Sequence, residues 1–191
     1  MTENEIIDRI IGGERDLYRI LVEEHQDMVF RTCMGFVHNK DDADDLSQEV
    51  FTQAYESLKK FKKESSFSTW LYRIAVNASL NKARKTGRSF VFQQIESLLG
   101  SVKQSPVEIV ATNTEDPENI MIREENQRWL QRALDRLPEN QRTAIVLSKY
   151  DDLSQKEISE IMNISEGAVE ALIQRAKANL RKNLSVFSKK K

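Results

Sequence analysis

Residues 152–184 carry the sequence DLSQKEISEIMNISEGAVEALIQRAKANLRKNL, and this stretch decides the fold. Its apolar residues recur at offsets that let two short helices cross steeply through a tight turn. These residues are Ile158, Met162, Ile164, Val169 and Leu172. The pattern predicts a helix, a turn and a second, longer helix that runs to about Leu184.

The ends of both helices are marked by residues that bond to free backbone groups. Ser154, followed three residues later by Glu157, predicts a capping box at the start of the first helix. Asn163 stands where the chain must bend, and asparagine tolerates a left-handed backbone better than most other residues. Ser165 is then the expected cap of the second helix.

Two helices in this arrangement are typical of a helix-turn-helix, whose second helix enters the major groove of DNA. An ordinary helical hairpin in a bundle has the same pattern, so this signal alone leaves both interpretations open. The basic residues Arg175, Lys177, Arg181 and Lys182 favour DNA, because phosphate contacts supply most of the affinity. Glu166 and Glu170 repel phosphate, so we expect the isolated domain to bind DNA weakly.

The rest of the chain also has a helical character. Of 191 residues, 39% are hydrophobic and 31% charged, which is typical of a folded, helix-rich protein. Helical periodicity is strong up to about Arg84, fades through a stretch with four Gly and Pro residues, and returns from Ile120. We therefore predict an all-α protein with helical domains at 1–88 and 120–187, a flexible linker at 89–119 and a basic tail at 188–191.

The net charge of −1 hides a strong segregation of charge. Residues 59–88 hold nine basic side chains and one acidic one, and residues 175–191 hold seven basic and none acidic. Residues 89–126, by contrast, hold two basic and seven acidic side chains. Two positive patches are what a DNA-contacting surface requires, although each patch alone also fits a solvated helix face.

Two further segments precede the linker. Residues 41–61 predict an amphipathic helix with an acidic start, capped by Asp41 or Asp42. Residues 67–85 interleave aromatic side chains with cations, a combination suited to single-stranded DNA because every base has a face for stacking. The alternative is that Trp70 or Tyr72 belongs to the core, and we expect this of at least one of them.

Together these segments resemble the sigma-seventy family of bacterial transcription initiation factors, specifically its extracytoplasmic-function group. The resemblance rests on DDLSQEVF at 44–51, FSTWLYRIAVN at 67–77, LPENQR at 137–142 and the helix-turn-helix. It implies a promoter-specificity subunit with three contact surfaces. Binding to the largest-subunit clamp of core RNA polymerase is expected of Asp44, Asp45, Gln48, Glu49 and Phe51.

The other two surfaces implied by the resemblance contact promoter DNA. The minus-ten element is expected to meet Lys62, Lys63, Phe67, Trp70, Tyr72, Arg73, Asn77, Asn81, Arg84 and Lys85, with Phe67 near a base flipped from the stack. The minus-thirty-five element is expected to meet Ser165, Glu166, Gly167, Ala168, Glu170, Ala171, Gln174, Arg175 and Lys177. Because many relatives carry Arg or Ser where this chain has 170–172, their promoter sequences should not be assumed here.

Two other functions were weighed against this one. A stand-alone helix-turn-helix regulator with a sensing or dimerisation domain would not need the aromatic and basic run before the linker. An interaction protein such as an anti-factor decoy is the third possibility, favoured only by Glu166 and Glu170. An enzyme is least expected, because no phosphate loop, metal-ligand cluster or nucleophile–base pair is apparent.

The remaining expectations concern cofactors, location and regulation. The single cysteine, Cys33, lies in an apolar run and is expected to be a buried thiol, and neither a metal nor a cofactor is predicted. With no signal peptide or membrane-length apolar stretch, the protein is expected in the cytoplasm. The resemblance further implies an anti-sigma factor, either soluble or membrane-bound, that holds the protein inactive.

Overall fold

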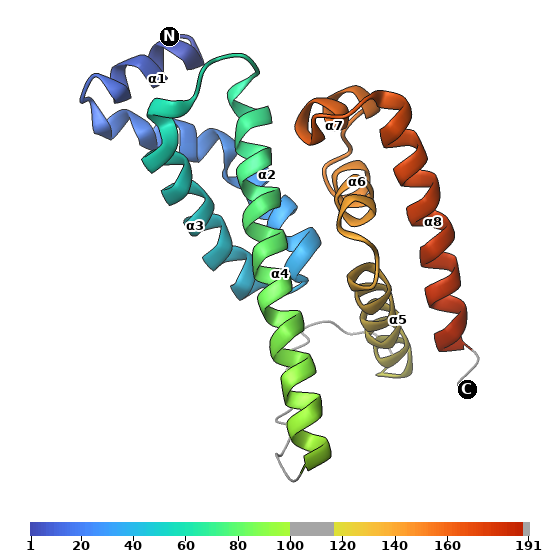
Figure 1. The fold of residues 1–191 in the computed structure, drawn as a ribbon. Coiled ribbons are helices and arrows are strands. Elements are labelled where there is room, and N and C mark those ends of the chain that lie inside the picture. The colour runs from blue at the N-terminus through green and yellow to red at the C-terminus, as the bar shows by residue number, and fades with distance from the viewer. Residues whose placement is uncertain (100–116, 189–191) are drawn as a thin grey trace.

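The computed structural model describes residues 1–99 and 117–188, with side chains described over 1–85 and 125–185. Within these ranges every regular element is a helix, which confirms the expected fold class (Figure 1). The elements are α1 (Glu3–Ile11), η1 (Arg15–Leu17), α2 (Tyr18–Val37), α3 (Lys40–Ser57), η2 (Leu58–Lys60), α4 (Phe67–Leu99), α5 (Pro117–Asp135), α6 (Glu139–Lys149), α7 (Gln155–Met162) and α8 (Glu166–Ser188). None of the described helices is long and apolar enough to cross a bilayer.

The N-terminal domain is a bundle in which α2, α3 and α4 pack on one another and α1 covers one end. Its core contains Leu21, Cys33, Val50 and Leu71, all fully buried. Cys33 is therefore the buried thiol that the sequence predicted, and burial raises its pKa. The C-terminal domain consists of α5 to α8 around its own apolar core.

Helix ends largely follow the expected caps, with two corrections. Asn39, not Asp41 or Asp42, caps α3, since its side-chain oxygen accepts a hydrogen bond from the Asp42 amide at 3.0 Å. The two aspartates lie in the first turn, where their negative charges stabilise the helix by interacting with the positive end of its dipole. Pro138 is the residue before α6 and not its first helical residue, and its fixed φ of −53° directs the chain into the helix.

The predicted linker is shorter in the structure, because α4 continues through Leu99 and α5 already begins at Pro117. Gly87 costs a helix interior about 1 kcal/mol relative to alanine, too little to end a long helix on its own. Pro117 is compatible with a first helical position, where its missing N–H is not needed. The remaining part of the linker, residues 100–116, and tail residues 189–191 lie outside the described residues.

The two domains are not separated on a tether, as the sequence analysis expected, but pack together (Figure 1). Phe36 from α2 and Tyr72 and Val76 from α4 belong to one buried cluster with Ala144 and Val146 from α6. Packing of this kind depends on contacts between residues far apart in the chain, which helical periodicity does not report. The structure is a closed form in which α4 lies beside α6 and α7.

Candidate nucleic-acid interface

The helix-turn-helix forms as the sequence predicted. Ser154 accepts a hydrogen bond from the Glu157 amide at 3.3 Å, and the Glu157 carboxylate accepts one from the Ser154 amide at 2.8 Å. The hydroxyl of Ser154 also holds the pKa of Glu157 below its usual value. Asn163 ends α7 in the left-handed region with a φ of 54°, and Ser165 caps α8 by accepting from the Ala168 amide at 3.2 Å. Both helices are thereby held at the steep crossing that the motif requires.

The start of α8 presents the predicted minus-thirty-five residues to solvent. Two of them, Ala168 and Ala171, are half-buried and the others exposed. No atom lies within 4 Å of the position that a β-carbon on Gly167 would take, so this part of the helix surface is open. Glu166 and Glu170 place carboxylates there, and Arg175 and Lys177 place cations on the following turns. A surface of mixed charge can read bases, while its cations bind phosphate.

Four polar residues form a stripe along α4. Arg73, Asn77, Asn81 and Arg84 follow one another at spacings of four, four and three, so their side chains share one face of the helix. Arg84 donates to the Asn81 side chain at 3.4 Å. We call these four residues the α4 stripe. In the closed form the two arginines of this stripe bind the C-terminal domain, while Asn77 and Asn81 are exposed.

Both cations of the α4 stripe bind the C-terminal domain. Arg73 donates to the backbone carbonyls of Glu160 at 2.7 Å and Ile161 at 3.3 Å. Arg84 makes a two-pronged ion pair with Glu139, at 2.5 Å for each oxygen, and its hydrogen bonds lower the pKa of Glu139. Bidentate pairing with a carboxylate uses the same donor geometry as pairing with phosphate.

The aromatic residues of the predicted minus-ten site mostly lie in the core. Phe67 is only 1% exposed and contacts the rings of Phe61, Trp70 and His25. Tyr72 is also buried, against the C-terminal domain, while Trp70 is half-buried. The ring of Phe67 is therefore not available for a flipped base in this form. The sequence could not distinguish a stacking ring from a core ring, because both follow the same helical spacing.

Basic residues flanking α4 are accessible. Lys62 and Lys63 lie in the loop before α4 and are exposed, and Lys63 pairs with Asp8 at 2.5 Å. Lys85, one residue after Arg84, is also exposed. These cations extend the positive charge beyond both ends of the α4 stripe.

The predicted polymerase-binding residues separate into an exposed set and a buried one. Asp44, Asp45, Gln48 and Glu49 are exposed on α3. Phe51 is buried, and its backbone carbonyl accepts a hydrogen bond from the Tyr18 hydroxyl at 2.7 Å. Phe51 therefore supports α3 from within and does not form part of its surface.

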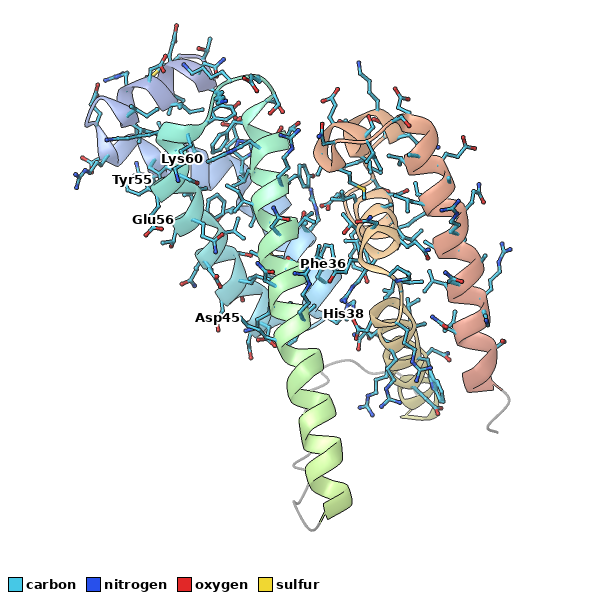
Figure 2. All side chains as sticks on the ribbon, viewed as in Figure 1. Phe36, His38, Asp45, Tyr55, Glu56 and Lys60 are labelled. Atoms are coloured by element: carbon cyan, nitrogen blue, oxygen red, sulfur yellow. The ribbon has the colours of Figure 1, made fainter. Side chains whose placement is uncertain are left out.

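The outer face of α3 extends further than the sequence analysis indicated. Tyr55 and Glu56 are exposed on α3 and Lys60 follows in η2, on the same outer side as Asp45 and away from the C-terminal domain (Figure 2). Extending the helical spacing from Asp45 by seven and eleven residues would have led to Thr52 and Glu56. We call Asp44, Asp45, Gln48, Glu49 and Glu56 the α3 face.

One cluster of metal-binding residue types also exists. Single ligand atoms of Glu3, Glu24 and His25 lie within 4.8 Å of one another. His25 already bonds to Glu3 at 2.8 Å, which ties the start of α1 to α2. This pairing gives Glu3 and His25 a structural role. Because Glu3 lies 21 residues before Glu24 along the chain, close ligand spacing in the sequence does not reveal the cluster.

Comparison with known proteins identifies the family. Residues 21–89 match the family model for sigma-70 region 2, and residues 127–180 match the model for sigma-70 region 4. The chain is 34% identical to the ECF RNA polymerase sigma factor SigW of Bacillus subtilis, over 93% of this chain and 94% of that protein. The chain belongs to the extracytoplasmic-function group of the sigma-70 family.

A second relative is similar in sequence, and two solved structures are similar in fold. The chain is 33% identical to the ECF sigma-E factor of Escherichia coli K12, over 93% of this chain and 91% of that protein. The fold resembles that of CnrH, solved with the cytosolic domain of CnrY, with a TM-score of 0.63, 22% identity and coverage of 95% of this chain and 96% of that one. RpoE of Bartonella quintana, solved with the anti-sigma factor NepR, has a TM-score of 0.55, 20% identity and coverage of 88% and 97%.

The family assignment decides between the functions considered from the sequence. A sigma factor is the promoter-specificity subunit of RNA polymerase, so the chain functions in transcription initiation and the stand-alone regulator is not supported. Sigma factors act as specificity subunits of the polymerase, and none of the matching families is catalytic. The positions of region 2 and region 4 correspond to the N-terminal and C-terminal domains described above.

Proposed function

We propose that this sigma factor binds polymerase and promoter DNA through three separate surfaces. The α3 face docks on the clamp of the largest subunit of core polymerase. The α4 stripe, with Lys62, Lys63 and Lys85, holds the separated strand of the minus-ten element. The start of α8, from Ser165 to Lys177, contacts the minus-thirty-five element.

The observation that carries the proposal is the exposure of the α3 face on the side away from the C-terminal domain (Figure 2). Four carboxylates and an amide on one helix surface suit a basic or polar partner surface, because complementary charge speeds encounter and fixes orientation. Phe51 and its neighbours secure the helix from beneath, so the surface is presented on a rigid element.

The α4 stripe supports the second assignment through its chemistry. A guanidinium group stands at each end of the stripe, where it can bind phosphate, and two amides that can contact bases lie between them on the same helix. With Phe67 in the core, the polar and cationic side chains capture the strand, and Phe67 supports the start of α4. Any contact of the Phe67 ring with a flipped base would require the ring to leave the core.

The residues at the start of α8 suit contact with the minus-thirty-five element, and we expect their affinity for that DNA to be moderate. Glu170 can accept a hydrogen bond from the cytosine amino group, and Gln174 can pair with adenine, whereas Arg175 and Lys177 bind phosphate. Because the acidic residues repel phosphate, stable promoter binding needs the additional contacts of the α4 stripe and the polymerase. The regulated genes are proposed to be a stress or envelope-response set, as for the group the chain resembles.

We also propose that a dedicated anti-sigma factor controls this protein from the cytoplasmic side, either as a soluble protein or as the soluble part of a membrane protein. Two proteins of similar fold were solved with partners, the cytosolic domain of CnrY and the anti-sigma factor NepR. If the purified chain alone changed its transcription activity in response to a stress signal, a separate partner would be unnecessary.

The test of the α3 assignment is a charge reversal with a matched control. Asp45→Arg should weaken binding to core polymerase by about tenfold or more, which corresponds to about 1.4 kcal/mol. Asp27→Arg is the control, since Asp27 is also an exposed aspartate and lies on α2, outside the α3 face. Binding is measured by fluorescence anisotropy of the labelled sigma factor against core polymerase. Equal effects of the two substitutions would contradict the assignment.

A further inference from the structure

A partly buried cluster of metal-binding residue types lies where the start of α1 meets α2. Single ligand atoms of Glu3, Glu24 and His25 all lie within 4.8 Å of one another. Nε2 of His25 is 2.8 Å from Oε1 of Glu3, and the His25 side chain is only 11% exposed. The three residues belong to none of the surfaces that we assign to polymerase or promoter DNA, so a role for them goes beyond the proposed function.

The separations within the cluster approach those around a metal ion. Zn²⁺ binds histidine nitrogen and carboxylate oxygen at about 2.0–2.2 Å, which places two neighbouring ligand atoms about 3 Å from each other. The ligand atoms of Glu3 and His25 already stand close to this separation, and Glu24 is an exposed side chain that can turn toward them. Binding of an ion between the three residues would therefore mainly require the rotation of one surface side chain.

The two carboxylates of the cluster have no lysine or arginine partner among the side chains that the structure describes. His25 bonds to Glu3 alone, which leaves Glu24 with neither an ion pair nor a hydrogen bond over the same part of the chain. The preceding residue, Glu23, does pair with a cation, Arg19, at 3.6 Å. Because like charges this close repel each other, a divalent cation between the carboxylates would remove the repulsion and supply the missing charge.

Two of the three ligands stand on elements that are fixed by other contacts. Glu3 is the first residue of α1, where Thr2 and Glu5 form a capping box: the Thr2 amide donates to the Glu5 carboxylate at 2.8 Å, and the Glu5 amide donates to the Thr2 hydroxyl at 3.3 Å. The His25 ring lies 5.3 Å from the ring of Phe67, centre to centre. Ligands that are held in place before the ion arrives favour binding, because less order has to be imposed on them.

The types of ligand favour a transition metal over the alkaline-earth ions. Imidazole suits zinc, copper, iron and nickel, whereas Mg²⁺ and Ca²⁺ are bound through oxygen. Three protein ligands, with water at the remaining position, is also a common arrangement for zinc in an open site. One imidazole and two carboxylates therefore match Zn²⁺ and ions like it.

We propose that Glu3, Glu24 and His25 bind a divalent transition-metal ion, of which Zn²⁺ is the representative, and that this ion fastens α1 to α2. The ion takes the place of the direct hydrogen bond between Glu3 and His25 and adds Glu24 as a third ligand. Because His25 lies against Phe67, the first residue of α4, the bound ion stabilises the end of the N-terminal domain where these three helices meet.

Isothermal titration calorimetry with Zn²⁺ on the full chain tests the site, with Glu24→Gln as the variant and Glu23→Gln as its matched control. Both substitutions remove one exposed carboxylate from α2, and only Glu24 belongs to the cluster. Glutamine has nearly the helix propensity of glutamate, so both variants should fold, which circular dichroism verifies. Loss of an outer-shell partner already weakens metal binding about 10–100-fold, so Glu24→Gln should weaken Zn²⁺ binding by about tenfold or more. Glu23→Gln should bind Zn²⁺ as the parent protein does.

Stability and hydrogen exchange test the fastening of α1. With Zn²⁺ at about 100 times its dissociation constant, the thermal midpoint of the parent protein should rise by about 5–10 °C, and amide exchange in α1 should slow. Neither change is expected for Glu24→Gln at the same Zn²⁺ concentration. No Zn²⁺ binding by the parent protein, equal binding by the two variants, or displacement of Zn²⁺ by an equal concentration of Mg²⁺ would overturn the site. Binding at the site without slower exchange in α1 would overturn the fastening.

Discussion

At the scale of single residues, Asp151 shows how closure depends on one carboxylate. Its side chain is 0% exposed, accepts a hydrogen bond from Thr32 at 2.9 Å and lies 3.7 Å from Arg31. Burial raises the pKa of Asp151 to about 6, although the Thr32 hydroxyl and the Arg31 charge oppose the rise and Asp152 adds to it. The carboxylate in turn raises the pKa of Tyr72 on α4, after the larger effect of burial. A solvated aspartate in separated domains has a pKa of about 3.9.

The closed form therefore binds a proton more tightly than the open form. The resulting stabilisation is complete below about pH 4 and is lost as the pH rises through about 6. We predict that the radius of gyration increases between pH 5 and pH 8. Asp151→Asn, which stays neutral and can still accept from Thr32, should remain closed at both values. Scattering measured at the two pH values checks this, and an identical response in both proteins would exclude Asp151 as the cause.

Arg142 gives a second prediction at this scale. Arg142→Ala removes the donor to the Phe36 carbonyl and the pair with Asp135, and it leaves a cavity beside Phe36. We expect a loss of about 2–3 kcal/mol in the free energy of unfolding, measured in urea. Arg132→Ala, which changes an exposed arginine on α5, is the comparison and should cost far less. Similar losses for the two would mean that the Arg142 contacts contribute little.

At the scale of helices, the sequence predicted well those helix ends that depend on neighbouring residues. The capping box at Ser154 and Glu157, the left-handed Asn163 and the cap at Ser165 all depend on residues within four positions of one another. The cap of α3 was misplaced, because Asn39, Asp41 and Asp42 are all good caps within one turn. The full length of α4 was missed because Gly87 weakens a helix without ending it.

Ser154→Ala tests the helix-turn-helix at this scale. Loss of an N-cap typically costs about 1 kcal/mol, so the thermal midpoint should fall and α7 should exchange its amide protons faster. Ser185→Ala is the control, since the Ser185 hydroxyl donates to the Lys182 carbonyl late in α8 and caps no helix start. Hydrogen exchange localises the effect. Equal protection of α7 in the two variants would show that the cap contributes little.

At the scale of the whole molecule, sequence predicted the two domains but not their contact. The pairs that close the molecule join residues far apart in the chain, such as Arg84 with Glu139 and Thr32 with Asp151. From its residue type, Arg84 was expected to contact DNA and the carboxylates to be solvated. Helical periodicity does not show that residues so far apart in the chain are paired. The start of α8 was predicted from the helix-turn-helix pattern, and Asp44, Asp45, Gln48 and Glu49 of the α3 face were expected from the family resemblance. The burial of Phe51, Phe67 and Tyr72 depended on tertiary packing.

We propose above that this sigma factor recognises promoters through these surfaces once it is bound to polymerase. The most direct measurement is transcription by bacterial core RNA polymerase, with the purified chain, from a pool of random promoter fragments. We expect transcripts from fragments that share two separated sequence blocks. Asp45→Arg should abolish these transcripts, whereas Asp27→Arg should not. No polymerase binding and no selected promoters, from a protein that circular dichroism shows to be folded, would contradict it.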